Sequence, residues 1–316
     1  MKKPGILEAV ALLTTIFFFG AMEGGSFFAF LFLYLAPLPL FILGLKKDNS
    51  WCGLVGAVAA VSLFFITTPQ MSIMYLLAIA APTTFFCEKA VSRTGTSLKG
   101  WYSLSKLSLL LIVPPSFCFV LLTAYFWLYG QGLGFVFIEK TNEIFDLYIT
   151  ALKGQGQNIN PSLSKQLDGV KKSFADTAPA LISIFWMSLI VLNGLIAQSI
   201  LKKSNRNQRP SFAIREVQIP RSFAVIFLSS LALASFSSGE LGYLVTNLTA
   251  ILAFPVMLTG LGVIHTFADK TNYSGSILLV LYLIIMFSRW AAIFVVLVGI
   301  ADHFLKLRNK VQADKV

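Results

Sequence analysis

Nine long apolar stretches, joined by short polar or basic connections, are the feature that most limits how this chain can fold. The hydrocarbon core of a bilayer is about 30 Å thick, and a helix needs about 20 apolar residues to cross it. The stretches have roughly this length and therefore predict an all-α polytopic membrane protein. They cover residues 6–22, 26–44, 52–68, 71–87, 107–129, 179–201, 221–238, 244–267 and 276–301.

The composition supports this interpretation. Hydrophobic residues make up 56% of the chain and charged residues only 12%, whereas a typical soluble domain has about 25% charged residues. Half the usual charge cannot cover a soluble globule of this size. An ordinary soluble enzyme and a disordered chain are both excluded.

The basic residues indicate the orientation in the membrane. Most of them lie at the amino terminus, in loops 45–51, 88–106 and 202–221, and in the carboxyl-terminal tail. Basic residues collect in the cytoplasmic loops of membrane proteins, so the net charge of +11 does not indicate nucleic acid. We expect a multi-pass protein of the bacterial cytoplasmic membrane with both termini in the cytoplasm.

Nine full crossings would place the basic tail on the far side of the membrane. We therefore expect eight crossings plus one broken or re-entrant segment, with nine crossings as the alternative. The run 244–267 is the candidate for the broken segment, because it contains Asn247, Pro255, Gly260 and Gly262.

The same scheme divides the chain into three parts. Residues 1–129 form an amino-terminal membrane half, and residues 178–316 form a carboxyl-terminal half that includes the basic loop 202–221. Residues 130–177 form an extracytoplasmic amphipathic segment. Within it, apolar residues recur at helical spacing over 133–152, which predicts a helix on the protein or on the membrane surface. We expect a second short helix from Pro161 to Phe174.

Motifs of catalysis are absent. The chain has no Walker loop, no GxSxG and no HExxH, and it contains only two histidines. Cys52, Cys87 and Cys118 are odd in number, form no CxxC and lie in apolar surroundings, so we interpret them as buried small residues. The sequence thus predicts no catalytic residue, no metal and no cofactor.

Polar residues at membrane depth are the candidates for substrate binding, because each is costly to insert. Arg289 lies near the middle of 276–301, where an arginine costs about 2.5–3.5 kcal/mol on insertion scales. Tyr282 precedes it by seven residues and shares nearly the same helix face. Asn247, His265 and Glu23 complete the set. Their structural alternatives are interhelical hydrogen bonding for Asn247, a solvated helix end for His265 and a solvated turn for Glu23.

Prolines interrupt several of the apolar runs. They are Pro37, Pro39, Pro82, Pro114, Pro115 and Pro255. Each frees a backbone carbonyl and kinks its helix. Broken helices in membranes line a cavity or pack against protein, and the sequence leaves both alternatives open.

Three patches of sequence are similar to a known family. Leu35-Ala36-Pro37-Leu38-Pro39-Leu40, Gly260-Leu261-Gly262-Val263-Ile264-His265 and Gly299-Ile300-Ala301-Asp302-His303-Phe304 resemble the YybS-like family of uncharacterised bacterial membrane proteins. The opening half also resembles, more weakly, the substrate-binding membrane subunits of energy-coupling-factor transporters. The first resemblance implies a membrane protein without an assigned activity, and the second implies vitamin binding without an ATPase in this chain.

We therefore expect a protein that binds or transports a small or amphiphilic molecule without its own ATPase. Its partners would be membrane lipids and an ATP-hydrolysing or envelope protein at the cytoplasmic loops. The alternative is a non-transporting scaffold for cell-envelope assembly, and a third hypothesis is an intramembrane enzyme. A cavity lined by Arg289 and the proline breaks would favour transport, and tight packing would favour a scaffold.

Overall fold

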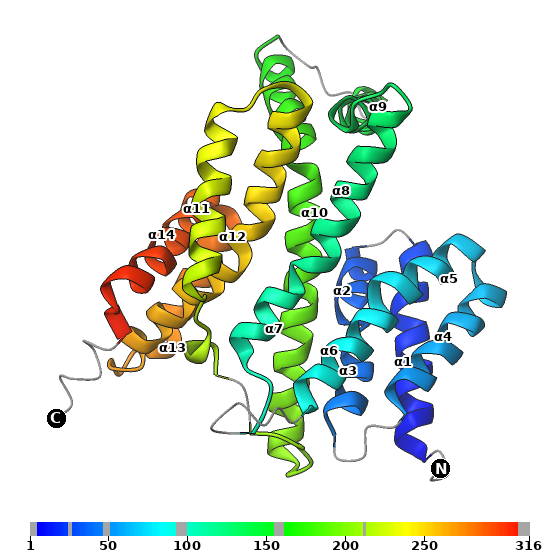
Figure 1. Cartoon of the computed structure of the whole chain (residues 1–316). Helices are drawn as coiled ribbons and strands as arrows, with labels where there is room; N and C mark the ends of the chain where they lie inside the picture. The colour runs from blue at the N-terminus through cyan, green and yellow to red at the C-terminus, as the bar shows by residue number, and fades with distance from the viewer. Residues whose placement is uncertain are drawn as a thin grey trace. The chain divides into compact units, whose positions relative to one another are not determined.

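The computed structural model describes residues 5–24, 27–46, 51–92, 100–154, 161–210 and 213–308 (Figure 1). Within these ranges the chain is helical and contains no β-strand. The prediction of an all-α fold is confirmed for the described residues. Every apolar stretch predicted to cross the membrane coincides with one or more helices.

Five helical segments in the described ranges are long and apolar enough to cross a membrane. They are Phe28–Leu45, Pro69–Val91, Leu104–Leu128, Leu163–Lys203 and Gly239–Ala268. A sixth results if the bent pair Ser274–Phe287 and Arg289–Leu305 counts as one span. Three further apolar helices are shorter: Ile6–Gly20, Cys52–Ile66 and Arg221–Phe236.

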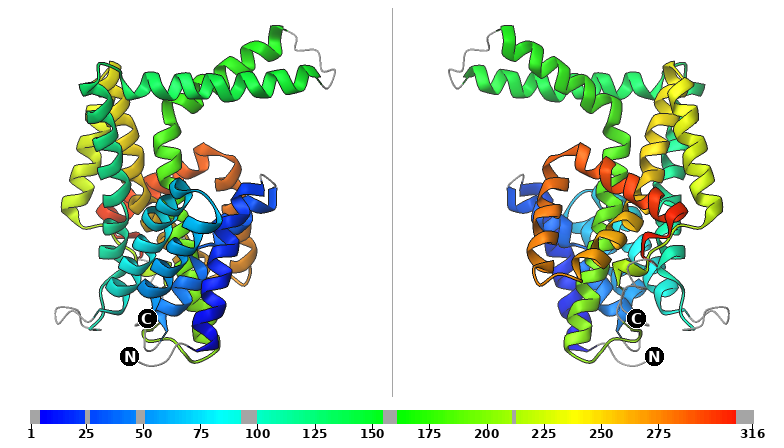
Figure 2. Two further views of the ribbon diagram at one scale, coloured as in Figure 1. Left: turned by 90° about the vertical axis from the view of Figure 1, so that its right-hand side faces the viewer. Right: turned by 90° about the vertical axis from the view of Figure 1, so that its left-hand side faces the viewer.

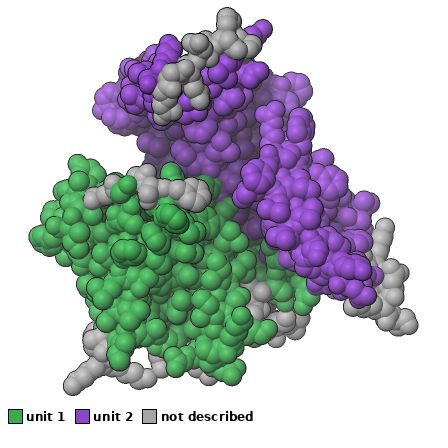
Figure 3. Space-filling view, turned by 180° about the vertical axis from the view of Figure 1, so that it is seen from behind, with its two compact units in different colours: residues 1–108, 185–216 green, residues 109–184, 217–316 purple. Residues whose placement is uncertain are grey.

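The chain forms two compact units, residues 1–108 with 185–216 and residues 109–184 with 217–316 (Figure 3). The two units come from packing, whereas the three segments expected from the sequence come from membrane topology and stay a prediction. Helix α10, Pro161–Lys203, begins in the second unit and ends in the first.

The first unit is built from short helices. They are α1 (Ile6–Gly20), α2 (Phe27–Leu35), α3 (Leu38–Leu45), α4 (Cys52–Ile66), α5 (Pro69–Tyr75), the π-helical turn Leu76–Ala80, α6 (Ala81–Val91) and most of α7 (Leu104–Leu111). Its core contains the fully buried side chains of Tyr75, Leu40 and Leu63.

Side chains donate hydrogen bonds to backbone carbonyls beside the proline breaks of this unit. Pro82 has no N–H, so the carbonyl of Ala78 loses its helical partner, and the indole of Trp186 donates a 2.7 Å hydrogen bond to it. At the break between α2 and α3, Asn193 Nδ2 donates to the Tyr34 carbonyl at 2.7 Å and Thr15 donates to the Ala36 carbonyl at 2.8 Å. These breaks pack against protein.

The second unit is built around the 30-residue apolar helix α12. Its helices are α8 (Val113–Leu128), α9 (Leu133–Gly154), the first part of α10, α11 (Arg221–Phe236), α12 (Gly239–Ala268), α13 (Ser274–Phe287) and α14 (Arg289–Leu305). Helix α12 packs on α11, α13 and α14. We refer to α9 together with residues 161–178 of α10 as the arm, which extends away from α8, α11 and α12 (Figure 2).

Two expectations about helix continuity were wrong. Residues 244–267 were expected to be broken, yet they lie within the continuous helix α12, and the break falls instead at Ser288, where α13 and α14 differ in direction by 119°. Pro161–Phe174 is not a separate short helix, because it is the beginning of the 43-residue helix α10. The helix predicted over 133–152 is present as α9.

Candidate functional site

The first turn of α12 holds the beginning of the arm. Glu240 accepts a hydrogen bond from the backbone N–H of Gly134 at 3.3 Å. A Cβ atom at Gly132 would collide with the Glu240 carboxylate, so any other residue there would push this carboxylate aside. An anionic carboxylate at the amino end of α9 also complements the positive end of its helix dipole. Glu240 therefore caps α9 from another helix.

Asn247 repairs α10 at its internal proline. Pro179 lacks an N–H, so the Ala175 carbonyl is freed, and the hydroxyl of Tyr243 donates to it at 3.2 Å. The Asn247 amide occupies the next position of the ladder: its Oδ1 accepts from Ala180 N at 3.1 Å, and its Nδ2 donates to the Asp176 carbonyl at 2.9 Å. The buried amide thus replaces one hydrogen bond of α10 with two. This is the interhelical hydrogen bonding that the sequence offered as the alternative to substrate binding.

Helices α12 and α14 cross with their backbones in contact. A Cβ atom at Gly260 would collide with the Val295 carbonyl, and one at Gly299 would collide with the Val256 carbonyl. Two glycines facing each other let the helices approach more closely than any side chain would permit. This crossing fixes the position of the residues that follow in α14.

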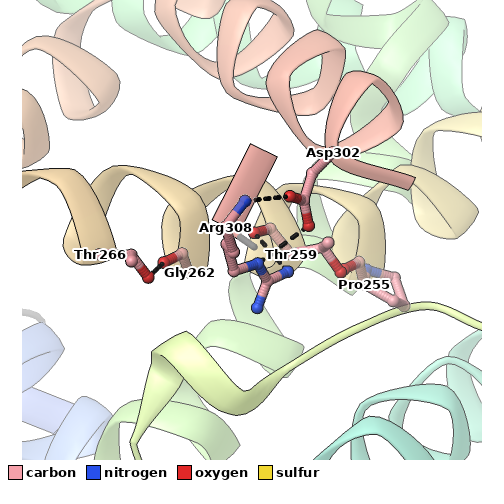
Figure 4. A network of polar contacts seen from close by, with 6 residues as sticks. All are labelled: Pro255, Thr259, Gly262, Thr266, Asp302 and Arg308. Atoms are coloured by element: carbon pink, nitrogen blue, oxygen red, sulfur yellow. Dashed lines mark hydrogen bonds and ion pairs between the residues drawn. The ribbon is translucent and has the colours of Figure 1, made fainter. Parts of the chain in front are cut away.

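A buried ion pair lies beside the crossing (Figure 4). Arg308 Nε contacts Asp302 Oδ2 at 2.9 Å, and the two side chains are 5% and 7% exposed. The Arg308 guanidinium also donates to the Thr259 carbonyl of α12 at 3.4 Å. Lys306, which ends α14 in the left-handed conformation with φ of 49°, turns the chain back and brings Arg308 to Asp302.

The ion pair forms one wall of a pocket of about 240 Å³, which we call the α14 pocket. Lys306 and His303 add further polar groups to it. A pocket with more basic than acidic side chains can bind an anionic group through charge-assisted hydrogen bonds. Its lining consists of Gln218, Ile219, Thr259, Asp302, His303, Lys306 and Arg308.

The structure brings together two of the residues predicted from the sequence. His265 Nε2 and the Tyr282 hydroxyl are 2.9 Å apart, which joins the last turn of α12 to α13. Asp269, one turn beyond His265, accepts a 3.4 Å hydrogen bond from Ser274. Neither His265 nor Tyr282 lines the α14 pocket.

Arg289 lies elsewhere than the sequence suggested. It is the first residue of α14, not the middle of a helix, and it is exposed, with its guanidinium 5.6 Å from the centre of the Trp290 ring. Its expected position near the middle of a helix over 276–301 was wrong, because the break at Ser288 moves it to a helix end. The side chain of Glu23 lies outside the described part of the chain.

The cysteines are free thiols, with Cys52 and Cys87 buried and Cys118 exposed. Burial is thus confirmed for two of the three. A Cβ atom at Gly44 would collide with the sulfur of Cys87 and lie 3.2 Å from that of Cys52, so both sulfurs flank this glycine. The described residues contain no group of three or more His, Cys, Asp or Glu that could hold a metal ion.

Arg209 ties down part of the basic loop 202–221 within the first unit. Its guanidinium donates to the carbonyls of Ala90 at 2.7 Å and Tyr102 at 3.2 Å, and it lies over the Trp101 ring. Burial lowers the pKa of Arg209 to about 10, which still leaves it charged at neutral pH. The other basic residues of this loop are exposed.

A model of the DUF2232 family, described as predicted membrane proteins, matches residues 11–303. The chain belongs to the DUF2232 family. No curated protein and no solved structure matches the chain. The resemblance to a YybS-like family of membrane proteins is consistent with this result, and the resemblance to energy-coupling-factor subunits stays a prediction.

The DUF2232 match covers the glycine crossing and ends at His303, inside the α14 pocket. Asp302 and His303 were visible in the sequence as the end of the last span, but their pairing with Arg308 was not. A residue six positions later reaches Asp302 only because Lys306 adopts a left-handed turn. A lysine does not predict such a turn, since glycine and asparagine are the residues that usually adopt it.

Proposed function

We propose that this DUF2232 protein binds a small or amphiphilic molecule with an anionic head group in the α14 pocket, without an ATPase of its own. The observation that carries this proposal is the set of basic and polar side chains around the buried Asp302–Arg308 pair, between helices that are otherwise apolar. Asp302 holds the Arg308 guanidinium in place, and Lys306 supplies a second cation. A head group such as a phosphate would meet both.

Other candidate cavities have less support. The freed carbonyls at Pro82 and Pro179 are occupied by Trp186 and Tyr243 and offer nothing to a ligand. Arg289 is exposed and lines no part of the α14 pocket. Binding at Arg289, Tyr282, His265, Asn247 or Glu23 is therefore the weaker version of the proposal.

The same proposal includes a topology of eight crossings with both termini in the cytoplasm of a bacterium. The bend of 119° between α13 and α14 supports a re-entrant segment at this place. If α13 and α14 enter and leave on one side, the loop containing Lys270, the pocket and the basic tail all lie with loop 202–221 on the cytoplasmic side. This arrangement agrees with the preference of basic residues for that side.

Partners of the cytoplasmic face would contact the exposed side chains of loop 202–221. Lys202, Lys203, Arg206 and Arg215 are exposed there. Anionic lipid head groups attract such residues by about 1 kcal/mol each near the surface. An ATP-hydrolysing or envelope protein would use the same charges.

Replacing Lys306 with asparagine tests the pocket. Asparagine is neutral and tolerates the left-handed conformation, so the fold should be retained. The amount of anionic phospholipid that co-purifies with the variant should fall about tenfold or more, because one charge-assisted hydrogen bond is lost. Mass spectrometry measures this amount in the variant and in the wild type. The matched control is Lys172→Asn, which changes an exposed lysine of α10.

Two probes separate the sources of the anion. Stabilisation of the wild type by phosphatidylglycerol vesicles but not by inorganic phosphate indicates a lipid head group, and the reverse indicates a free anion. Equal lipid retention and equal phosphate response in Lys306→Asn, Lys172→Asn and the wild type would reject the pocket as a binding site.

A non-transporting scaffold for envelope assembly is the second candidate function. The breaks at Pro37 and Pro82 favour it, since their carbonyls are hydrogen-bonded to side chains instead of lining a cavity. The arm also favours it, because it carries exposed apolar side chains beyond the helices that hold it. Crosslinking from the arm to one defined envelope protein in intact cells, with normal assembly in Lys306→Asn, would support the scaffold over the binding protein.

A further inference from the structure

Helix α9 leaves an apolar strip uncovered. Ile144, Leu147 and Tyr148 are 61%, 73% and 54% exposed, and their spacing places them on one face of the helix. Phe145, Ile149 and Leu152 form the neighbouring apolar face and are half-buried. Glu139 lies on the face opposite Tyr148, whereas the ion-paired Lys140 and Glu143 lie one turn before Ile144 and Leu147 on the same side of the helix. We call Ile144, Leu147 and Tyr148 the arm strip.

The end of α8 marks the level at which the chain leaves the membrane. Tyr125, Trp127 and Tyr129 are exposed there, and the rings of Tyr125 and Tyr129 are 4.7 Å apart. Tyrosine and tryptophan are enriched where a helix meets the head groups. Helix α9 begins only a few residues later, after Gly130, whose φ of 75° allows the sharp turn.

The direction of α9 places it along that level. Figure 2 shows that α9 turns away at the end of α8 and runs across it. Since α8 belongs to a segment apolar enough to cross the membrane, a helix that runs across its end follows the membrane surface.

The arm is also fixed where it joins α12. Glu240 caps α9, and Asn247 and Tyr243 hold α10 at Pro179. These contacts fix the direction of the arm relative to α12. The position of the arm strip is therefore also fixed relative to the end of α12.

The net charge of the arm indicates whether electrostatic attraction or apolar insertion would attach it to a membrane. Residues 130–177 contain five acidic and five basic side chains, and Lys171 and Asp146 pair across the two helices at 3.2 Å. A segment without net charge gains little from anionic lipids. Attachment must come from apolar insertion and should be insensitive to salt.

We propose that the arm lies in the interfacial layer of the extracytoplasmic leaflet with the arm strip inserted among the lipids. Interfacial helices bury their apolar face about 5–10 Å into the boundary between head groups and acyl chains. The occupant of the strip is thus the lipid surface. This inference uses the proposed topology but does not depend on a ligand in the α14 pocket.

Fluorescence quenching in proteoliposomes of the full-length protein tests it. A polarity-sensitive dye is attached at Tyr148→Cys, and the matched control carries the dye at Glu139→Cys. These positions are nine residues apart, which is two and a half helical turns, so they lie on opposite faces. Cys118 is replaced by alanine in both, because it is the exposed native thiol.

Lipids with a quencher on the acyl chain should quench the dye at position 148 at least about threefold more than the dye at 139, and aqueous iodide should do the reverse. Both effects should be unchanged by high salt. Equal iodide quenching at both sites would overturn the proposal. Shielding of position 148 from both quenchers in pure vesicles would indicate a second copy of this chain instead, and shielding that appears only in native membranes would indicate a protein partner.

Discussion

Helix α12 and the α13–α14 pair differ in how well helix-breaking residues predict where a helix is broken. Residues 244–267 contain a proline and two glycines, yet α12 runs unbroken through them. Residues 274–305 contain no proline and are bent by 119° at Ser288. The difference lies in burial: α12 has buried side chains along most of its length, whereas α13 has none.

Packing therefore decides continuity here more than the helix-breaking residues do. In α12 the glycines are not weak points, because Gly260 gives α14 the space to approach. The hydroxyl of Thr259 donates to the Pro255 carbonyl at 3.0 Å, which adds a hydrogen bond within α12. No buried side chain of α13 offers comparable support for a straight continuation into α14.

Replacing Gly260 with leucine should have the largest effect. The new side chain cannot fit against the Val295 carbonyl, so the α12–α14 crossing should separate and the yield of monodisperse protein should fall severalfold. The control is Gly275→Leu in α13, where a Cβ atom would meet nothing within 4 Å. Size-exclusion chromatography in detergent compares them, and similar elution of both variants would contradict the close crossing.

Removing Arg308 should be the next most damaging change. Arg308→Leu leaves Asp302 buried without its cation, which should lower the free energy of unfolding by about 3–5 kcal/mol. Arg206→Leu, at an exposed site, should change it by less than about 0.5 kcal/mol. Adding Asp302→Asn to Arg308→Leu should recover part of the loss. Denaturant titration measures these variants and Asp302→Asn alone, and additive losses in the double variant would argue against a direct pair.

Asn247→Leu should cost about 1–3 kcal/mol, because it leaves the Ala180 N–H and the Asp176 carbonyl without their partner. The cost should shrink in a Pro179→Ala background, where α10 can restore its own hydrogen bonds. Hydrogen exchange of Ala180 in the four proteins of this cycle measures the effect. An equal cost in both backgrounds would mean that Asn247 does not compensate for the proline.

The sequence predicted what depends on composition and periodicity. The apolar stretches correctly predicted helices, and the amphipathic pattern of 133–152 correctly predicted α9. The break at Ser288 could not be predicted, because it depends on the burial of α13, which no local pattern reports. The α14 pocket was missed for a similar reason, since Arg308 reaches Asp302 through an unusual backbone conformation at Lys306.

For the candidate site residues too, the sequence predicted the need for a polar partner but not which group the partner is. Asn247 was correctly recognised as a polar residue that needs a partner, but its partner is the backbone beside Pro179, a proline outside the set considered. His265 and Tyr282 were identified for separate reasons, and only the turn between α12 and α13 brings them together. Arg289 was assigned to a helix centre because the run 276–301 has no proline and its glycine, Gly299, lies far from Ser288.

Arg289→Leu should have the smallest effect on stability. The exposed guanidinium contacts the Trp290 ring, and such an interaction is worth about 0.5–1 kcal/mol. The melting temperature should therefore change little, whatever the variant does to cellular activity. A large loss of stability would show that Arg289 has a buried role and that α13 and α14 are packed differently.

The most direct test of where the chain is bent compares two distances across equal lengths of chain. Spin labels at Leu244 and Phe267 span α12, and labels at Ile277 and Ile300 span the bend at Ser288. Twenty-three residues of continuous helix cover about 34 Å, and a bend of 119° reduces this to about 18 Å. We predict the long distance across Pro255 and the short one across Ser288. Two long distances, or a short distance across Pro255, would contradict the claim that packing places the break after α13.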